Sequence, residues 1–273
     1  MIDNILEWNF NILIEKGVTK NQIKGNIYSD YYIDVDFEVD DNFFDNNFLG
    51  FSYLVPNNED EKAQQKYYSK VFRNINIQGE SLLPQESRLA LYYLDNDLVN
   101  YFNPEFCNKI LVNDSKVDFV RYLALLSQYK DAQSINSLAK GFSRKMEKYY
   151  EEFIYFAVGE ETSKIFGDSS LIFKKKNISE NFDLLEKTIA QLDLFKKYES
   201  IIDLDIALFG LIYFIVFMEK EIDCCNKNEL LKKISEKIDE LRGIPRHLKT
   251  PSALKYLRKR VEDSISIYEE FVK

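Results

Sequence analysis

Three carboxylates alternate with apolar residues in the segment YYIDVDFEV, which covers residues 31–39. Asp34, Asp36 and Glu38 would share one face of a strand at intervals of about 7 Å, because side chains repeat every two residues along a strand. Carboxylate oxygens are preferred ligands of hard divalent cations, so this row is a candidate metal site. A solvated strand face that discourages edge pairing explains the same pattern and is the favoured interpretation.

A second segment with possible chemistry is basic. Residues 242–260 hold seven Lys or Arg side chains and no acidic one. The cations that we expect on one surface are Arg246, Lys249, Lys255, Arg258 and Lys259. The first two, together with His247, should lie in a loop before a helix that we expect to start near Thr250. The other three recur at three- and four-residue steps along that helix. Such a surface could contact the phosphates of a nucleic acid without reading its sequence, whereas the alternative is an ordinary solvated helix face.

Composition excludes several catalytic classes. The chain has one histidine, His247, and three cysteines, too few for a histidine-rich metal site or a zinc finger. It has neither a G-x-x-x-x-G-K-[ST] phosphate loop nor a G-x-G dinucleotide fingerprint. We therefore expect no cofactor. An alternative is a standalone metal-dependent, phosphate-processing enzyme, in which the Asp34 row binds the metal and Arg73 or Arg88 binds phosphate.

The segment KVFRNINIQGESLLPQESRLALYYLD, residues 70–95, predicts a helix-loop-helix corner. Gly79 allows a backbone conformation that other residues resist, and Pro84 suits the first position of a helix. Glu86 then lies at the third helical position, where its carboxylate can reach the free amides of the helix start.

This corner resembles the GmrSD-type family of bacterial restriction and phage-defence proteins. The family pattern is F-[ER]-x-[IL]-N-x-x-G-x-x-L-x-x-Q-E-[IS]-R-x-A-[IL]-[YF], and the matching residues are Phe72, Arg73, Ile75, Asn76, Gly79, Leu82, Gln85, Glu86, Arg88, Ala90 and Leu91. VDFVRYLALLSQY resembles a helix downstream of this motif, and YYIDVDFEV resembles the strand before it. The resemblance covers roughly residues 31–155. It implies a ParB/sulfiredoxin-like N-terminal region followed by a helical part.

Two parts of such proteins have no counterpart in this sequence. The D-G-Q-Q-R motif, which the family links to nucleotide hydrolysis, would precede residue 31, yet the first 30 residues contain no arginine. The HNH-type nuclease region of the family needs more than one histidine.

The resemblance therefore implies an accessory or split-subunit helical portion that acts through a protein partner, with no catalysis of its own. The partner would carry the missing nucleotide-hydrolysing or nuclease domain. A purely structural interaction module is another alternative. The residues that would form either a structural clasp or a face toward the partner's nucleotide site are Arg73, Asn76, Gly79, Gln85, Glu86 and Arg88.

These residues must be positioned by a fold that the sequence predicts to be mostly α, a multi-helical bundle with a small antiparallel β unit near the N-terminus. The expected strands cover about 33–39 and 48–55. The expected helices cover about 61–75, 84–94, 116–130, 134–158, 180–199, 202–219, 227–241 and 250–272. We divide the chain into residues 1–60 with the β unit, 61–170 with the family-like motif, and a C-terminal helical region, 171–273.

Charge and hydropathy bear on location. Residues 1–60 hold 12 acidic and 3 basic side chains, which accounts for the whole net charge of -9. No signal peptide is recognisable. The longest apolar run, 206–218, is bracketed by Asp205 and Glu219 and is too short to cross a bilayer. The odd cysteine count and the adjacent Cys224 and Cys225 favour reduced thiols. We expect a cytoplasmic protein that does not enter a membrane.

Overall fold

The computed structural model describes residues 60, 63–64, 67–69, 71–72, 84–112, 114–159 and 162–273, with no side-chain detail at 84–87 and 169–170. The chain divides into two compact units, Met1–Tyr53 and Leu54–Lys273, and all described residues belong to the second. The expected boundary near residue 170 lies inside this second unit. Its buried residues form one apolar core, which runs from Leu91 to Phe271. The expected strands at 33–39 and 48–55 lie outside the described residues.

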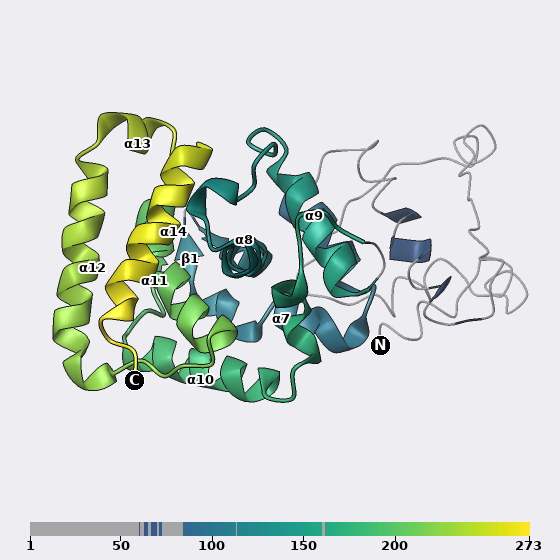
Figure 1. The fold of residues 1–273 in the computed structure, drawn as a ribbon, viewed down its shortest axis with the longest axis horizontal. Coiled ribbons are helices and arrows are strands. Elements are labelled where there is room, and N and C mark those ends of the chain that lie inside the picture. The colour runs from purple at the N-terminus through teal and green to yellow at the C-terminus, as the bar shows by residue number, and fades with distance from the viewer. Residues whose placement is uncertain are drawn as a thin grey trace, which may run out of the picture. The chain divides into compact units, whose positions relative to one another are not determined.

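The described part of the chain is mostly helical, as predicted. Its α-helices are α6 (Pro84–Tyr92), α7 (Val99–Phe102), α8 (Phe119–Ala132), α9 (Met146–Ala157), α10 (Ile178–Gln191), α11 (Ile201–Ile212), α12 (Lys227–Arg242), α13 (Pro245–Lys249) and α14 (Leu254–Glu269). The 3₁₀ turns are η1 (Asn96–Leu98), η2 (Glu105–Lys109), η3 (Ile135–Ser137), η4 (Asp168–Lys174) and η6 (Cys224–Asn226), and η5 (Tyr213–Phe217) is a π-turn. Figure 1 shows α8 end-on, between α9 and the layer that contains α11 and α14.

Three two-residue strands form a small mixed sheet in the order β2-β1-β3. β1 (Leu111–Val112) pairs antiparallel with β2 (Ser115–Lys116) and parallel with β3 (Lys197–Tyr198). The sequence did not predict these strands, because two residues are too few to show an alternation of apolar and polar side chains. The β1–β2 hairpin leads directly into α8 and so fixes where that helix begins.

The central helix is α11, in which every residue from Ile202 to Ile212 is buried. Ser200 caps its start by accepting a hydrogen bond from the Asp203 amide. α11 lies against α14 (Figure 1). Gly210 is at the closest approach, because a Cβ there would lie 2.4 Å from the carbonyl oxygen of Ser264. No described helix combines the length and the apolar character needed to span a membrane.

α11 ends in the π-turn η5, which widens the last turn of the helix. The Lys130 ammonium, at the end of α8, donates to the carbonyl of Phe217 in this turn. Glu219 follows with a left-handed backbone, φ +55°, and its carboxylate pairs with Lys175. The helical conformation therefore stops close to the predicted residue 219.

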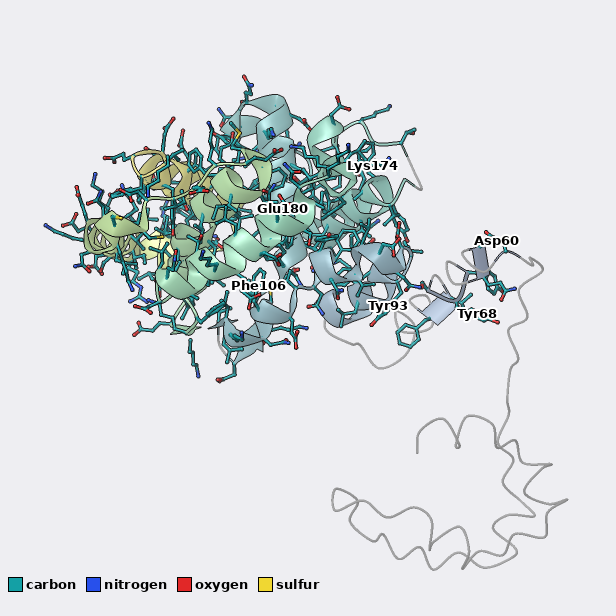
Figure 2. The ribbon with its side chains drawn as sticks, turned by 90° about the horizontal axis from the view of Figure 1, so that it is seen from below. Asp60, Tyr68, Tyr93, Phe106, Lys174 and Glu180 are labelled. Atoms are coloured by element: carbon teal, nitrogen blue, oxygen red, sulfur yellow. The ribbon has the colours of Figure 1, made fainter. Side chains whose placement is uncertain are left out.

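The segment 134–158, predicted as one helix, consists of two pieces. A 3₁₀ turn at 135–137 is followed by a loop in which Ala139 and Gly141 have positive φ angles, and α9 starts only at Met146. The two pieces nevertheless share one stripe of apolar residues that faces the core, since Leu138, Tyr149 and Phe153 are all fully buried. Figure 2 shows Tyr93 at the surface of the helical unit, where about half of the residue is exposed, whereas Phe106 is buried.

Candidate functional site

Arg88 from the family-like motif is fully buried on α6. Its guanidinium donates to Asp118, which precedes α8, and to Glu147 on α9. Its Nε lies 3.5 Å from the hydroxyl oxygen of Tyr92, and its Cζ lies 5.0 Å from the ring centre of Tyr150. Burial lowers the pKa of Arg88, but its neighbours, Asp118 foremost, outweigh burial and raise it above the ordinary value. We call Arg88, Asp118 and Glu147 the clasp, because they join three helices.

A second charged cluster lies where α8, α11 and α14 meet. The carboxylate of Asp205, fully buried, accepts two hydrogen bonds from Arg121 at 2.5 and 2.6 Å. It also accepts one from Arg260 Nε at 2.8 Å and one from the Tyr122 hydroxyl at 2.9 Å. Burial raises the pKa of Asp205, but the two guanidinium groups outweigh burial and lower it, so the carboxylate stays ionised. We call Arg121, Asp205 and Arg260 the triad.

The triad extends to the only histidine of the chain. Arg260 Nη1 lies 2.7 Å from His247 Nε2, and Arg260 Nη2 donates to the carbonyl of Pro251 at 2.9 Å. Burial and the charge of Arg260 lower the pKa of His247 to about 4, so its ring is neutral at pH 7. Because Arg260 donates to Nε2, the proton of the neutral ring is on Nδ1. That buried Nδ1 has no hydrogen-bond partner in the structure.

Between the clasp and the triad lies a cavity of about 370 Å³, which we call the central cavity. Arg121 and Arg260 line it on the triad side, and Asp118 and Glu147 line it on the clasp side. The site is therefore dipolar. The triad places two guanidinium groups around one carboxylate, whereas the clasp places two carboxylates around one guanidinium.

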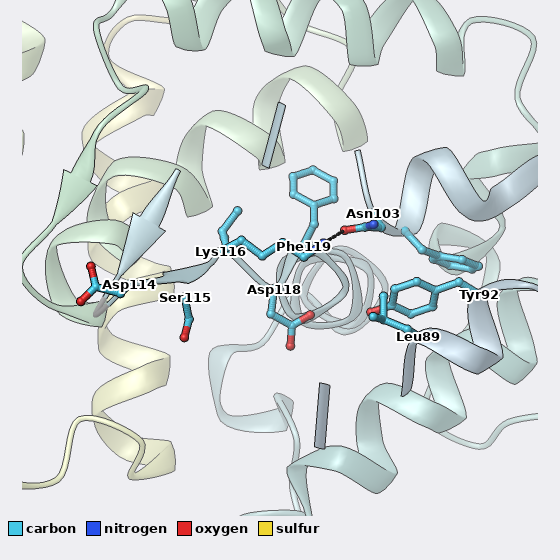
Figure 3. Close-up of a pocket in the computed structure, with 10 residues that line it drawn as sticks. Leu89, Tyr92, Asn103, Asp114, Ser115, Lys116, Asp118 and Phe119 are labelled. Carbon is cyan, nitrogen blue, oxygen red and sulfur yellow. Dashed lines mark hydrogen bonds between the residues drawn. The ribbon is translucent and has the colours of Figure 1, made fainter. Parts of the chain in front are cut away.

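A neighbouring cavity of about 320 Å³ (Figure 3) shares Lys116 and Asp118 with the central cavity. There the ammonium of Lys116 donates to the side-chain oxygen of Asn103 at 2.9 Å. The figure shows Lys116 reaching toward Asn103 while the Asp118 carboxylate points away from both. Lys116 lines both cavities, but its ammonium is bonded to Asn103, and the described partner of Asp118 is Arg88.

The structure divides the predicted basic surface. The Arg258 guanidinium donates to the carbonyl of Leu138 at 2.7 and 3.1 Å, and Lys259 pairs with Asp263. These two cations have structural partners. The three that remain exposed, with no carboxylate of the described residues paired to them, are Arg246, Lys249 and Lys255.

Two details of this basic segment differ from expectation. Residues 245–249 form the short helix α13 and not a loop, because Pro245 suits the first helical turn. The last helix then starts at Leu254 and not near Thr250. His247, expected in that loop beside the cations, is fully buried against Tyr256, with ring centres 4.5 Å apart.

The other predicted site residues are placed as follows. Gln85 and Glu86 belong to the first turn of α6, which begins at Pro84 as expected. The predicted residues that lie outside the described part of the chain are Asp34, Asp36, Glu38, Arg73, Asn76 and Gly79. Among the described residues, no three His, Cys, Asp or Glu side chains lie together as metal ligands would.

Sequence reasoning missed both partners of Arg88 and the whole triad. A signal for the triad exists, because Arg121 and Asp205 each interrupt strongly apolar stretches, VDFVRYLALL and IIDLDIALFG. A charged residue on the buried side of an apolar helix needs a buried partner of opposite charge. Comparison with known proteins adds no assignment, since no family model, curated protein or solved structure matches this chain.

Proposed function

We propose that this chain is an accessory or split-subunit helical portion of a GmrSD-like bacterial defence system, and that it acts through a protein partner. The partner supplies the nucleotide-hydrolysing or nuclease activity. The resemblance of residues 70–95 to that family suggests the defence system, and one contact supports the accessory role of this chain. Arg88, the buried arginine of the motif, is occupied by Asp118 and Glu147.

This contact favours the clasp over a face toward the partner's nucleotide site. A guanidinium that is fully buried and donates to two carboxylates is not available to a ligand phosphate. The motif then serves to join α6 to α8 and α9. In this proposal, the role of the motif is to fix the architecture that a partner recognises, and the chemistry belongs to the partner.

The test is a pull-down of the full chain from its native host, followed by mass spectrometry and a turnover assay. We expect a partner with a nucleotide-hydrolysing or nuclease domain in stoichiometric amount, and turnover of GTP or ATP only by the complex. Robust turnover by the purified chain, lost in a matched catalytic variant of it, would instead establish the standalone enzyme. Capture of no such partner would leave the structural module as the better account.

A second candidate activity is contact with nucleic acid. The observation that favours it is the exposure of Arg246, Lys249 and Lys255 without paired carboxylates among the described residues. Lys255 lies 4.5 Å above the ring of Tyr256, so a cation and an aromatic ring are adjacent on this surface. Backbone phosphates are the expected contact, and binding would be indifferent to sequence.

A further inference from the structure

The central cavity has binding groups left over at both of its ends. At the positive end, Arg121 has five N–H groups and directs two of them at Asp205. The other three have no partner among the described residues. Its guanidinium also packs against two rings that contact each other, with Cζ 5.2 Å from the centre of Tyr122 and 5.3 Å from that of Phe209. The group is therefore rigid and prepared to bind an anion.

At the negative end, Asp118 uses one carboxylate oxygen, Oδ2, on Arg88. Its other oxygen accepts no hydrogen bond from the described residues, and 17% of the side chain is exposed. Asp118 directly precedes α8, and Arg121 lies one helical turn further along. Both side chains line the central cavity, so the two unsatisfied groups face the same space.

We propose that the central cavity binds a small zwitterion. Its anionic group, a carboxylate or a phosphate, would bind Arg121, and its ammonium group would bind Asp118. A lone anion would be attracted by the guanidinium groups of the triad but repelled by the two carboxylates of the clasp. A lone cation would be attracted by those carboxylates but repelled by the guanidinium groups. One molecule with both charges satisfies both ends. A cavity of about 370 Å³ is at the small end of ligand sites and suits a molecule of amino-acid size.

The experiment is isothermal titration calorimetry on the full chain. The probes are γ-aminobutyrate, which carries a carboxylate, and O-phosphoethanolamine, which carries a phosphate. The singly charged controls are acetate, inorganic phosphate and ethylammonium. We expect at least one zwitterion to bind ten-fold or more tightly than either of its singly charged counterparts, and which zwitterion does so identifies the anionic group. Equal affinity for a zwitterion and its anion alone would overturn the proposal, as would no binding by any probe.

Two variants locate the site. Ser252 is exposed at the rim of the cavity and belongs to neither charged cluster, so Ser252→Trp should abolish zwitterion binding without unfolding the protein. Ser266→Trp, on an exposed position of α14 that does not line the cavity, is the matched control and should bind normally. Asp118→Asn should reduce zwitterion affinity to that of the anion alone. Unchanged binding by Ser252→Trp would place the ligand elsewhere and refute the assignment.

Discussion

Replacing Arg88 with alanine should destabilise the protein strongly. The substitution removes a fully buried cation and leaves the carboxylates of Asp118 and Glu147 facing each other without it. Removing one partner of a buried ion pair costs about 3–5 kcal/mol. The two carboxylate side chains are 17% and 39% exposed, so water can partly replace the guanidinium. We therefore expect the lower end, about 3 kcal/mol, which corresponds to a fall of about 6–12 °C in the melting temperature.

The assay is equilibrium unfolding in urea, followed by circular dichroism, with a thermal melt as a second measure. Arg246→Ala is the matched control, because Arg246 is exposed and unpaired with any described carboxylate; its effect should stay within about 0.5 kcal/mol. Arg88→Met keeps much of the apolar volume and removes the charge. If Arg88→Met is nearly as harmful as Arg88→Ala, the charge dominates over packing. An Arg88→Ala variant as stable as the Arg246→Ala control would refute the clasp.

Three further predictions concern the helix contact, the histidine and the basic surface. Gly210→Ala should destabilise by about 1–3 kcal/mol in urea unfolding, because its Cβ would lie 2.4 Å from the carbonyl oxygen of Ser264; an unchanged midpoint would contradict this close approach. His247 binds a proton at about pH 6.5 when unfolded but only near pH 4 when folded, so stability should fall as the pH drops from 6.5 to 4, by at most about 1.4 kcal/mol per pH unit. A His247→Gln variant should lack this contribution to the pH dependence of the free energy of unfolding. Parallel pH profiles of the two proteins would disprove the prediction. If nucleic acid binds, the slope of log affinity against log salt should shrink by about 2.7 when three cations are replaced by alanine; no salt-sensitive binding by the intact protein would remove nucleic acid as a ligand. The three cations are Arg246, Lys249 and Lys255.

The sequence predicted most helices because their apolar residues recur at helical spacing, but it joined two pieces at 134–158. The stripe continues across the break, since η3 and α9 face the same core, and periodicity alone cannot register a change in direction. Only Gly141, at φ +88°, marks the loop in the sequence. Local signals were reliable where one residue decides the geometry, as Pro84 does at the start of α6.

The candidate site was much harder to predict than the helices. Asp205 was taken as the charged boundary of an apolar run, yet it is completely buried. Its partners Arg121 and Arg260 are 84 and 55 residues away in the chain, so no local pattern connects them. The prediction for the basic segment failed in part for the same reason. The spacing of Arg258 and Lys259 predicted exposed cations, but Arg258 donates to the distant carbonyl of Leu138 and Lys259 pairs with Asp263.

The sharing of one buried carboxylate by two arginines has a consequence for how the bundle assembles. α11 carries Asp205, and the two cations arrive on α8 and α14. If only two of these helices docked, the intermediate would hold either an incompletely bonded carboxylate or a desolvated cation with no counterion, and both are costly. Partial bundles are therefore penalised relative to both the complete bundle and the open chain. The buried charges therefore favour docking of all three helices together, although they lie far apart in the sequence. We expect α8, α11 and α14 to exchange their amide hydrogens with solvent as a single cooperative unit.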